Sequence, residues 1–108
     1  VERTITKITY PSVRSGVYER VTYVETMKYT DFTASLTATF SYSIADKKVS
    51  CVSKYSTYSQ NFGLKSESLT DTGSGKTCTV KLKLFFNSAM GNSTKTISMK
   101  CDYKGNLV

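Results

Sequence analysis

The feature that most constrains the fold is a strict alternation of apolar and polar residues in the stretch 36–55. Within 36–44 every even position is apolar and every odd position carries a small hydroxylated side chain, which is the pattern of a β-strand with one buried face. Residues 45–48 interrupt this pattern, and 49–55 resume it with Ser53 as the exception. The stretch therefore predicts a β-hairpin with a short loop.

The expected register of this hairpin places four residues of the first strand opposite four of the second on the inner face: Ile44 with Val49, Tyr42 with Cys51, Phe40 with Ser53 and Ala38 with Tyr55. Side chains alternate between the two faces of a strand, so a slip of one residue would expose the whole buried set.

Other segments of the chain also alternate with a period of two. The expected elements are a leader or edge strand in 1–15, a long strand in 17–29, a short strand in 62–69, a loop at 71–75, and a second hairpin formed by 77–86 and 97–103. In the strand at 17–29, Glu19 and Glu25 interrupt the apolar face, and a bend is expected near Glu25. Two hairpins with apolar inner faces must pack against each other or close up to bury those faces.

The sequence therefore predicts an all-β protein, a single-domain antiparallel β-sandwich (Ig-like) of about six or seven strands. A small closed β-barrel is the alternative. We expect 1–16 to form an N-terminal leader or edge strand and 17–108 the β-sandwich domain. The expected inner residues are Leu36, Phe40, Tyr42, Val80, Leu82, Leu84, Ile97 and Met99.

Charge and hydropathy bear on the surroundings of the protein. The formal net charge is +7 and the pI is about 9.4, which favours polyanionic partners or simply solubility, because the basic residues are dispersed along the chain. No window of 18 or more residues is apolar, so no membrane span is expected. The chain starts at Val1 without an initiator Met or a signal sequence, which is typical of a trimmed or processed mature form.

The three cysteines, Cys51, Cys78 and Cys101, are all expected on inner faces. Either they remain buried free thiols, or one disulfide forms and one thiol stays unpaired, as in an exported protein. Loop-closure entropy does not distinguish the pairs. We favour a bridge between Cys51 and Cys101 across two sheets, since Cys78 and Cys101 are expected on neighbouring strands of one sheet. The chain has no His and no C-x-x-C spacing, so no metal site is expected.

Two motifs near residue 71 resemble catalytic ones. Residues 72–77 (TGSGKT) are similar to a nucleotide-binding P-loop, but that loop must open a helix, and a β-period follows here. Residues 71–74 (DTGS) are similar to the catalytic turn of aspartic proteases, but the preceding segment is largely polar and only 37 residues follow Asp71. Without His, the Ser–His and Cys–His nucleophile pairs are absent. We expect no enzymatic activity and no cofactor.

The eight tyrosines and the many Ser and Thr residues are the strongest indication of a contact surface. Tyrosine and small hydroxylated residues make adaptable contacts with proteins and glycans. Four tyrosines are expected in the core: Tyr23, Tyr29, Tyr42 and Tyr103. Tyr18, Tyr55 and Tyr58, together with Phe85, are the aromatic residues expected to be available for contact.

Two runs carry a resemblance to known proteins: LTATFSY at 36–42 and ISMKCDYKGN at 97–106. With the Ser- and Tyr-rich segment that follows the first run, they resemble small exported proteins of unknown function from Gram-positive bacteria, particularly gut Clostridia. The resemblance spans residues 17–106. It implies an Ig-like sandwich located outside the membrane, with no assigned activity.

The sequence thus favours a non-catalytic extracellular or cell-surface module whose partner is a protein or glycan, including anionic wall polymers. The alternative is a binder of single-stranded nucleic acid or another polyanion, with Lys81, Lys83 and Lys100 forming a basic outer face and Phe85 stacking on bases. If Cys78 lies opposite Cys101, these lysines share one face with Ser and Thr neighbours. An exported protein rarely meets nucleic acid, so this partner is not favoured.

Overall fold

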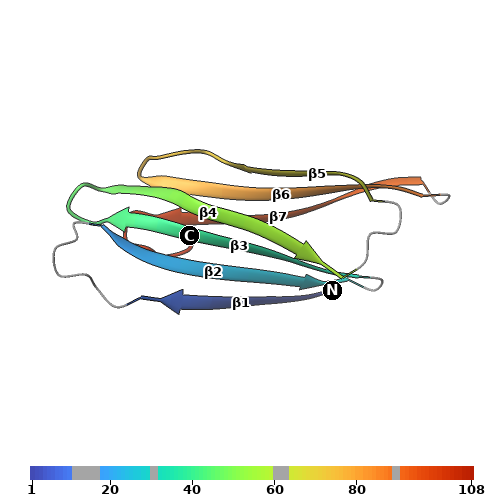
Figure 1. Ribbon diagram of the computed structural model, residues 1–108, viewed down its shortest axis with the longest axis horizontal. Coiled ribbons are helices and arrows are strands. Elements are labelled where there is room, and N and C mark those ends of the chain that lie inside the picture. Colours follow the sequence, from blue (N-terminus) through green and yellow to red (C-terminus); the bar gives the residue numbers. More distant parts are fainter. Residues whose placement is uncertain (11–17, 30–31, 60–63, 89–90) are drawn as a thin grey trace.

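The computed structural model describes residues 1–10, 18–29, 32–59, 64–88 and 91–108. Its seven strands are β1 (Glu2–Thr9), β2 (Glu19–Lys28), β3 (Thr33–Ser43), β4 (Lys48–Tyr58), β5 (Leu64–Asp71), β6 (Thr77–Ser88) and β7 (Gly91–Asp102). They form two antiparallel sheets, β1-β2-β3-β4 (sheet A) and β5-β6-β7 (sheet B), which pack face to face (Figure 1). The predicted all-β antiparallel sandwich is confirmed, and the described strands do not close into a barrel.

Each strand pairs with its neighbour in the chain, and the step from β4 to β5 crosses between the sheets. An immunoglobulin sandwich, in contrast, mixes distant strands in each sheet through Greek-key connections. A second link between the sheets is the pair of main-chain hydrogen bonds between Val49 and Gly75, at 2.7 and 3.1 Å. This bridge ties the start of β4 to the loop before β6.

The core lies between the two sheets and consists of alternate residues from β2, β3, β6 and β7, together with Val49 of β4. Seven of the eight expected inner residues are buried, and Tyr42 is half-buried and packs against the core. Of the four tyrosines expected inside, Tyr23 is buried, Tyr29 and Tyr42 are half-buried against the core, and Tyr103 lies outside the core cluster. The period of two therefore identified the inner face of β2, β3, β6 and β7 correctly.

The second hairpin, β6–β7, has the predicted register. Cys78 lies opposite Cys101, which places Lys81 opposite Ser98 and Lys83 opposite Thr96. The ladder runs further than predicted, as far as the pair Ser88–Gly91. Gly91 has a φ of 114° there, a conformation that a residue with a Cβ rarely adopts.

The register predicted for the first hairpin, β3–β4, is wrong. Tyr42 lies opposite Val49 and Phe40 opposite Cys51, and Ile44 belongs to the turn, where it is 58% exposed. The ladder then shifts between Thr39 and Phe40, leaving Val52 without a partner in β3. This is a β-bulge, which turns every later residue of β4 to the opposite face.

The bulge explains why the sequence pattern misled beyond Cys51, whereas nearer the turn the register differs by two residues because Ile44 lies in the turn. Beyond it, Ala38 lies opposite Lys54 and Thr37 opposite Tyr55, so that Lys54 points between the sheets and Tyr55 points to solvent. The apolar residue at 55 continued the alternation in the sequence but not in space.

The first strand, β1, pairs with β2 as the edge of sheet A and is exposed along its whole length. The segment 17–29 contains β2 as predicted, while Val17 lies outside the described residues. Glu25, expected to interrupt the apolar face, is on the inner face and only 3% exposed. Its Oε2 accepts a hydrogen bond from Nε of Arg3 at 2.8 Å, and its Oε1 has no hydrogen-bond partner among the described residues.

The predicted disulfide between Cys51 and Cys101 is wrong, because all three cysteines are free thiols. Strand β4 lies mainly over β6, and the main chain of Cys51 contacts the thiol of Cys78. Cys101 is on the next strand of sheet B, facing Cys78 in the ladder. The position of β4 over β6 thus brings Cys51 to Cys78 rather than to Cys101.

Candidate functional site

The outer face of sheet B is the basic surface that the sequence predicted. Lys81 and Lys83 on β6 and Lys100 on β7 are all exposed. Lys81 and Lys83 are two residues apart on one strand, which sets their Cα atoms about 7 Å apart. The pairings of β6 put each of these two between hydroxylated residues: Lys81 between Thr70 and Ser98, and Lys83 between Ser68 and Thr96. We call this surface, formed by the three lysines and these four neighbours, the basic face.

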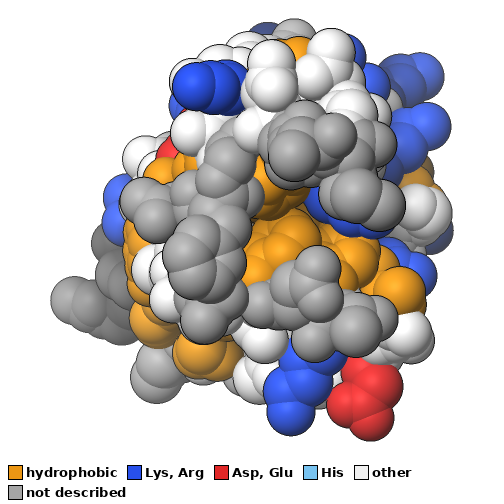
Figure 2. Space-filling model, turned by 90° about the vertical axis from the view of Figure 1, so that its right-hand side faces the viewer, with side chains coloured by type: hydrophobic (Ala, Val, Ile, Leu, Met, Phe, Trp, Pro, Cys, Tyr) orange, Lys and Arg blue, Asp and Glu red, His pale blue; other side chains and the backbone are white. Residues whose placement is uncertain are grey.

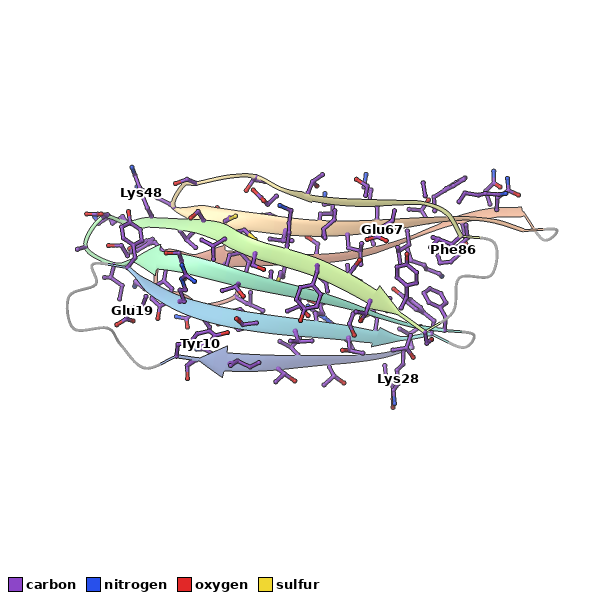
Figure 3. All side chains as sticks on the ribbon, viewed as in Figure 1. Tyr10, Glu19, Lys28, Lys48, Glu67 and Phe86 are labelled. Carbon is purple, nitrogen blue, oxygen red and sulfur yellow. The ribbon has the colours of Figure 1, made fainter. Side chains whose placement is uncertain are left out.

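The acidic residues of β5 do not reach the basic face because they point between the sheets. The carboxylate of Asp71 pairs with Nζ of Lys54 at 2.8 Å, and that of Glu67 accepts hydrogen bonds from Tyr58 at 2.9 Å and from Ser56. Figure 3 shows Glu67 at this edge. The three lysines therefore have no carboxylate among their partners in the described ladders of sheet B.

The pKa values at this edge reflect these contacts. The side-chain hydrogen bond from Lys54, followed by the hydrogen bond from the Gly73 N–H, lowers the pKa of Asp71 below its usual value. The same contact raises the pKa of Lys54. Both side chains therefore remain charged at neutral pH and bind each other rather than a ligand.

The four predicted contact aromatics do not come together. Tyr55 is 55% exposed on the outer face of sheet A, and Tyr18 is 42% exposed, with its hydroxyl toward the carboxylate of Asp46. Tyr58 is half-buried and bound to Glu67. Phe85 is half-buried on β6 beside Thr94 and Ser66. Only Tyr18 and Tyr55 thus present largely exposed rings, and they lie away from the lysines of the basic face.

The outer face of sheet A is rich in hydroxyl groups that bind one another. Thr22 Oγ1 hydrogen-bonds to Thr39 Oγ1 at 2.7 Å, and Thr26 Oγ1 to Ser35 Oγ at 2.8 Å. The hydroxyl of Tyr10 reaches Thr22 at 2.8 Å, near the end of β1 where Figure 3 labels it. The sequence showed the Thr and Ser residues but not these pairings, which depend on the register between β2 and β3. Hydroxyls already paired in this way are less available to a ligand.

The turn between β5 and β6, at 72–76, has a structural role. The Oδ1 of Asp71 accepts a hydrogen bond from the Gly73 N–H at 2.8 Å, and Gly73 has a φ of 80°. Strand β6 begins at Thr77, so the strand-to-helix context of a P-loop is missing. No group of three or more Cys, Asp or Glu residues that could hold a metal ion is found in the described part of the chain.

The thiols are also poorly placed for nucleophilic chemistry. Burial raises the pKa of all three, that of Cys101 to about 12. A thiol with such a pKa carries almost no thiolate at neutral pH, and the thiolate is the reactive form.

Figure 2 looks along the sandwich from the end where β1 begins and shows hydrophobic side chains between the two sheets. At this end Phe32 stacks on Tyr29 at a centroid distance of 4.7 Å and contacts Phe86 at 5.0 Å. Nζ of Lys95, whose side chain is directed inward from β7, lies 5.1 Å from the centre of the Tyr29 ring. The sequence did not predict this cluster, since its residues come from three separate segments.

Comparison of the chain with protein families, with curated proteins and with solved structures finds no match. Among the described residues no helix is long and apolar enough to cross a membrane.

Proposed function

We propose that this chain is a non-catalytic interaction module that acts outside the cell and binds an anionic polymer, such as a wall polymer or an acidic glycan, through the basic face. The observation that carries the proposal is the group of three exposed lysines framed by Ser and Thr, with no carboxylate opposite them in the ladders of sheet B. Localisation outside the cell rests on the resemblance of the sequence to exported proteins.

The arrangement fits a linear anion better than a compact one. The lysines are spread along two adjacent strands, and each ammonium group can approach a separate phosphate, sulfate or carboxylate. The hydroxyls between them can donate further hydrogen bonds to the same groups. Contacts of this kind neutralise charge on the polymer and release its counterions, so binding weakens as salt is added.

Binding to single-stranded nucleic acid requires exposed aromatic rings beside the lysines as well as positive charge. Phe85, the aromatic residue predicted for that role, is half-buried. This observation favours an anionic glycan or wall polymer over nucleic acid.

The test is titration with poly(glycerol phosphate), with a sulfated polysaccharide and with oligothymidylate across a salt series. The double variant Lys81→Gln/Lys83→Gln should weaken binding to the first two polymers at least tenfold and flatten the salt dependence. The matched control, Lys28→Gln/Lys48→Gln, removes the same charge from exposed positions outside the basic face and should change binding by less than threefold.

Equal losses in the two double variants would show that net charge, rather than the basic face, determines binding. Preferred binding of oligothymidylate would favour the nucleic-acid alternative. No binding to any of the three polymers would remove the polyanion proposal and leave a protein partner.

A further inference from the structure

Sheet A has four strands and sheet B has three. Figure 1 shows that β5 and β1 lie at opposite long edges of the sandwich. Strands β2 and β3 contact β7, whereas β1 extends beyond it. The inner face of β1 therefore has no strand of sheet B beneath it in the described structure.

The register confirms which residues of β1 face this space. Three residues of β1 lie opposite three of β2: Arg3 opposite Met27, Ile5 opposite Glu25 and Lys7 opposite Tyr23. Glu25 and Tyr23 are buried on the inner face. Directly paired residues share a face of the sheet. Ile5 thus points inward, yet it is 42% exposed, as expected where one strand is missing opposite it.

The chain itself begins to fill this position at one end. Residues 106–108, which we call the tail, turn back along β7 on the side away from β6. The Val108 N–H donates to the Lys100 carbonyl at 2.8 Å, and Leu107 forms an antiparallel bridge with Cys101. The Tyr23 hydroxyl donates to the Gly105 carbonyl at 2.6 Å, so this turn lies beneath β2.

The tail pairs only with the carboxyl end of β7, at residues 100–102. Because the Lys100 carbonyl points away from β6, alternation along the strand turns the main-chain groups of Ser98, Thr96 and Thr94 to the same side. These groups have no partner strand in the described structure. We call the space along this side of β7 the β7 lane. It is bounded by three sets of residues: 94–98 of β7, Arg3, Ile5 and Lys7 of β1, and Glu25 and Met27 of β2.

A buried group at the lane also lacks a partner. The carboxylate of Glu25 is bound by Arg3 through one oxygen only, and Oε1 is buried without a hydrogen bond among the described residues. A buried acceptor left unpaired costs about 1–3 kcal/mol. A segment that occupied the lane would bring N–H groups into this region.

We propose that the β7 lane binds one extended peptide strand of a partner protein, with acidic residues alternating with apolar ones. Main-chain groups of the peptide pair with Thr94, Thr96 and Ser98, in line with the tail, as in the addition of a strand to a sheet edge. Apolar side chains cover Ile5 and Met27. The acidic character follows from the charges around the lane: Arg3 is already paired with Glu25, and Lys7 from β1 and Lys95 from β7 add two further positive charges.

The probe is a seven-residue peptide that alternates valine with glutamate, and the control peptide carries lysine in place of glutamate. We expect the glutamate peptide to bind at least tenfold more tightly. Amide shifts in the NMR spectrum should concentrate at 94–98 and on β1. The peptide should bind equally well to the Lys81→Gln/Lys83→Gln variant, which separates this site from the basic face.

The decisive variant is Thr96→Pro, which removes the N–H that points into the lane but none that bonds to β6. Its matched control, Thr96→Ala, keeps the N–H. Thr96→Pro should weaken binding at least tenfold relative to Thr96→Ala. Lys7→Glu, on a strand that is exposed along its whole length, should also weaken binding at least fivefold, and this variant replaces Thr96→Pro in the test if Thr96→Pro does not fold.

Equal affinity of Thr96→Pro and Thr96→Ala would overturn the proposal, as would amide shifts confined to 68–70 and 81–83, or absence of binding to the glutamate peptide. Concentration-dependent self-association that is lost in Thr96→Pro would show that a second copy of the chain occupies the lane, and would also overturn the proposed partner.

Discussion

The two long edges of the sandwich are constructed differently. At the edge formed by β4 and β5, side chains from both sheets meet: Lys54 pairs with Asp71, and Ser56 and Tyr58 bind Glu67. At the edge formed by β1 and β7, one ion pair, Arg3–Glu25, links β1 to β2 within sheet A, and the inner face of β1 is exposed. The first edge is therefore closed by side chains, and the second remains open beyond the tail.

Both edges must still avoid pairing indiscriminately with other chains, and they do so by different means. The bulge at Val52 interrupts the ladder of β4 and turns Lys54 inward. Strand β1 instead carries two charged residues, Arg3 and Lys7, on its inner face. Bulges and inward-pointing charges are both common protections of edge strands. The closed edge is thus held by side-chain contacts between the sheets, whereas the open edge carries inward-pointing charges.

The largest expected effect compares an apolar residue at the centre with one at the open edge. Leu36→Ala removes a fully buried side chain and should cost about 2–5 kcal/mol of unfolding free energy. Ile5→Ala, at a position 42% exposed, should cost about 1 kcal/mol or less. Urea denaturation measures both, and similar losses would mean that the edge at β1 is packed after all.

The next effect concerns the ion pair at the open edge. Arg3→Met leaves the carboxylate of Glu25 buried without its one partner and should cost about 1–3 kcal/mol. Adding Glu25→Leu removes the stranded charge and should restore most of that stability, because an apolar pair often replaces a buried ion pair without loss. Urea midpoints of the two single variants and the double variant give the result. A double variant with a lower unfolding free energy than either single variant would contradict the expectation.

A smaller effect is expected at the turn that anchors the tail. Gly105 has a φ of 81°, and an added Cβ would lie 2.6 Å from ring atoms of Tyr42. Gly105→Ala should therefore cost about 1–2 kcal/mol and loosen the tail from β7. The bridge between Leu107 and Cys101 would weaken, so a thiol reagent should label Cys101 faster in the variant. An unchanged labelling rate would show that the tail is held without this turn.

The smallest effect is a pH dependence at the closed edge. The folded-state pKa of Asp71 is lowered, first by Lys54, so this contact stabilises the fold above the unfolded pKa and is lost as pH falls through the folded one. Asp71→Asn should cost about 0.2–1 kcal/mol at pH 7, because the pair is partly exposed. The difference from the unmodified chain should vanish as pH falls well below 3.8. Urea midpoints from pH 7 to pH 2 would show it, and a difference that grew in acid would refute it.

Local alternation predicted β6 and β7 down to the residue pairs because 77–86 contains no extra residue. It failed in β4 because Ile44 lies in the turn, which moves the register by two residues, and because Val52 forms a bulge that nothing in the order of residues 49–55 marks. The basic face was predictable for the same reason as β6: Lys81 and Lys83 follow the period of two.

Contacts between distant segments could not be predicted in this way. Glu25 looked like an interruption of the apolar face. Its carboxylate is bound by Arg3, which lies on β1 opposite Met27 of β2. The position of Cys51 beside Cys78 depends on the packing of β4 over β6. Both features require knowledge of which strands are neighbours in space.

The strictly sequential pairing of the strands has a consequence for how the chain folds. Each of the five strand pairings joins neighbours in the chain, so both sheets can form by zipping successive hairpins, without waiting for distant segments to meet. Docking of the two sheets is then the step that carries most of the loop-closure entropy. Folding rates fall as the mean sequence separation of contacts rises, so this sandwich should fold faster than one of equal size built on Greek-key connections.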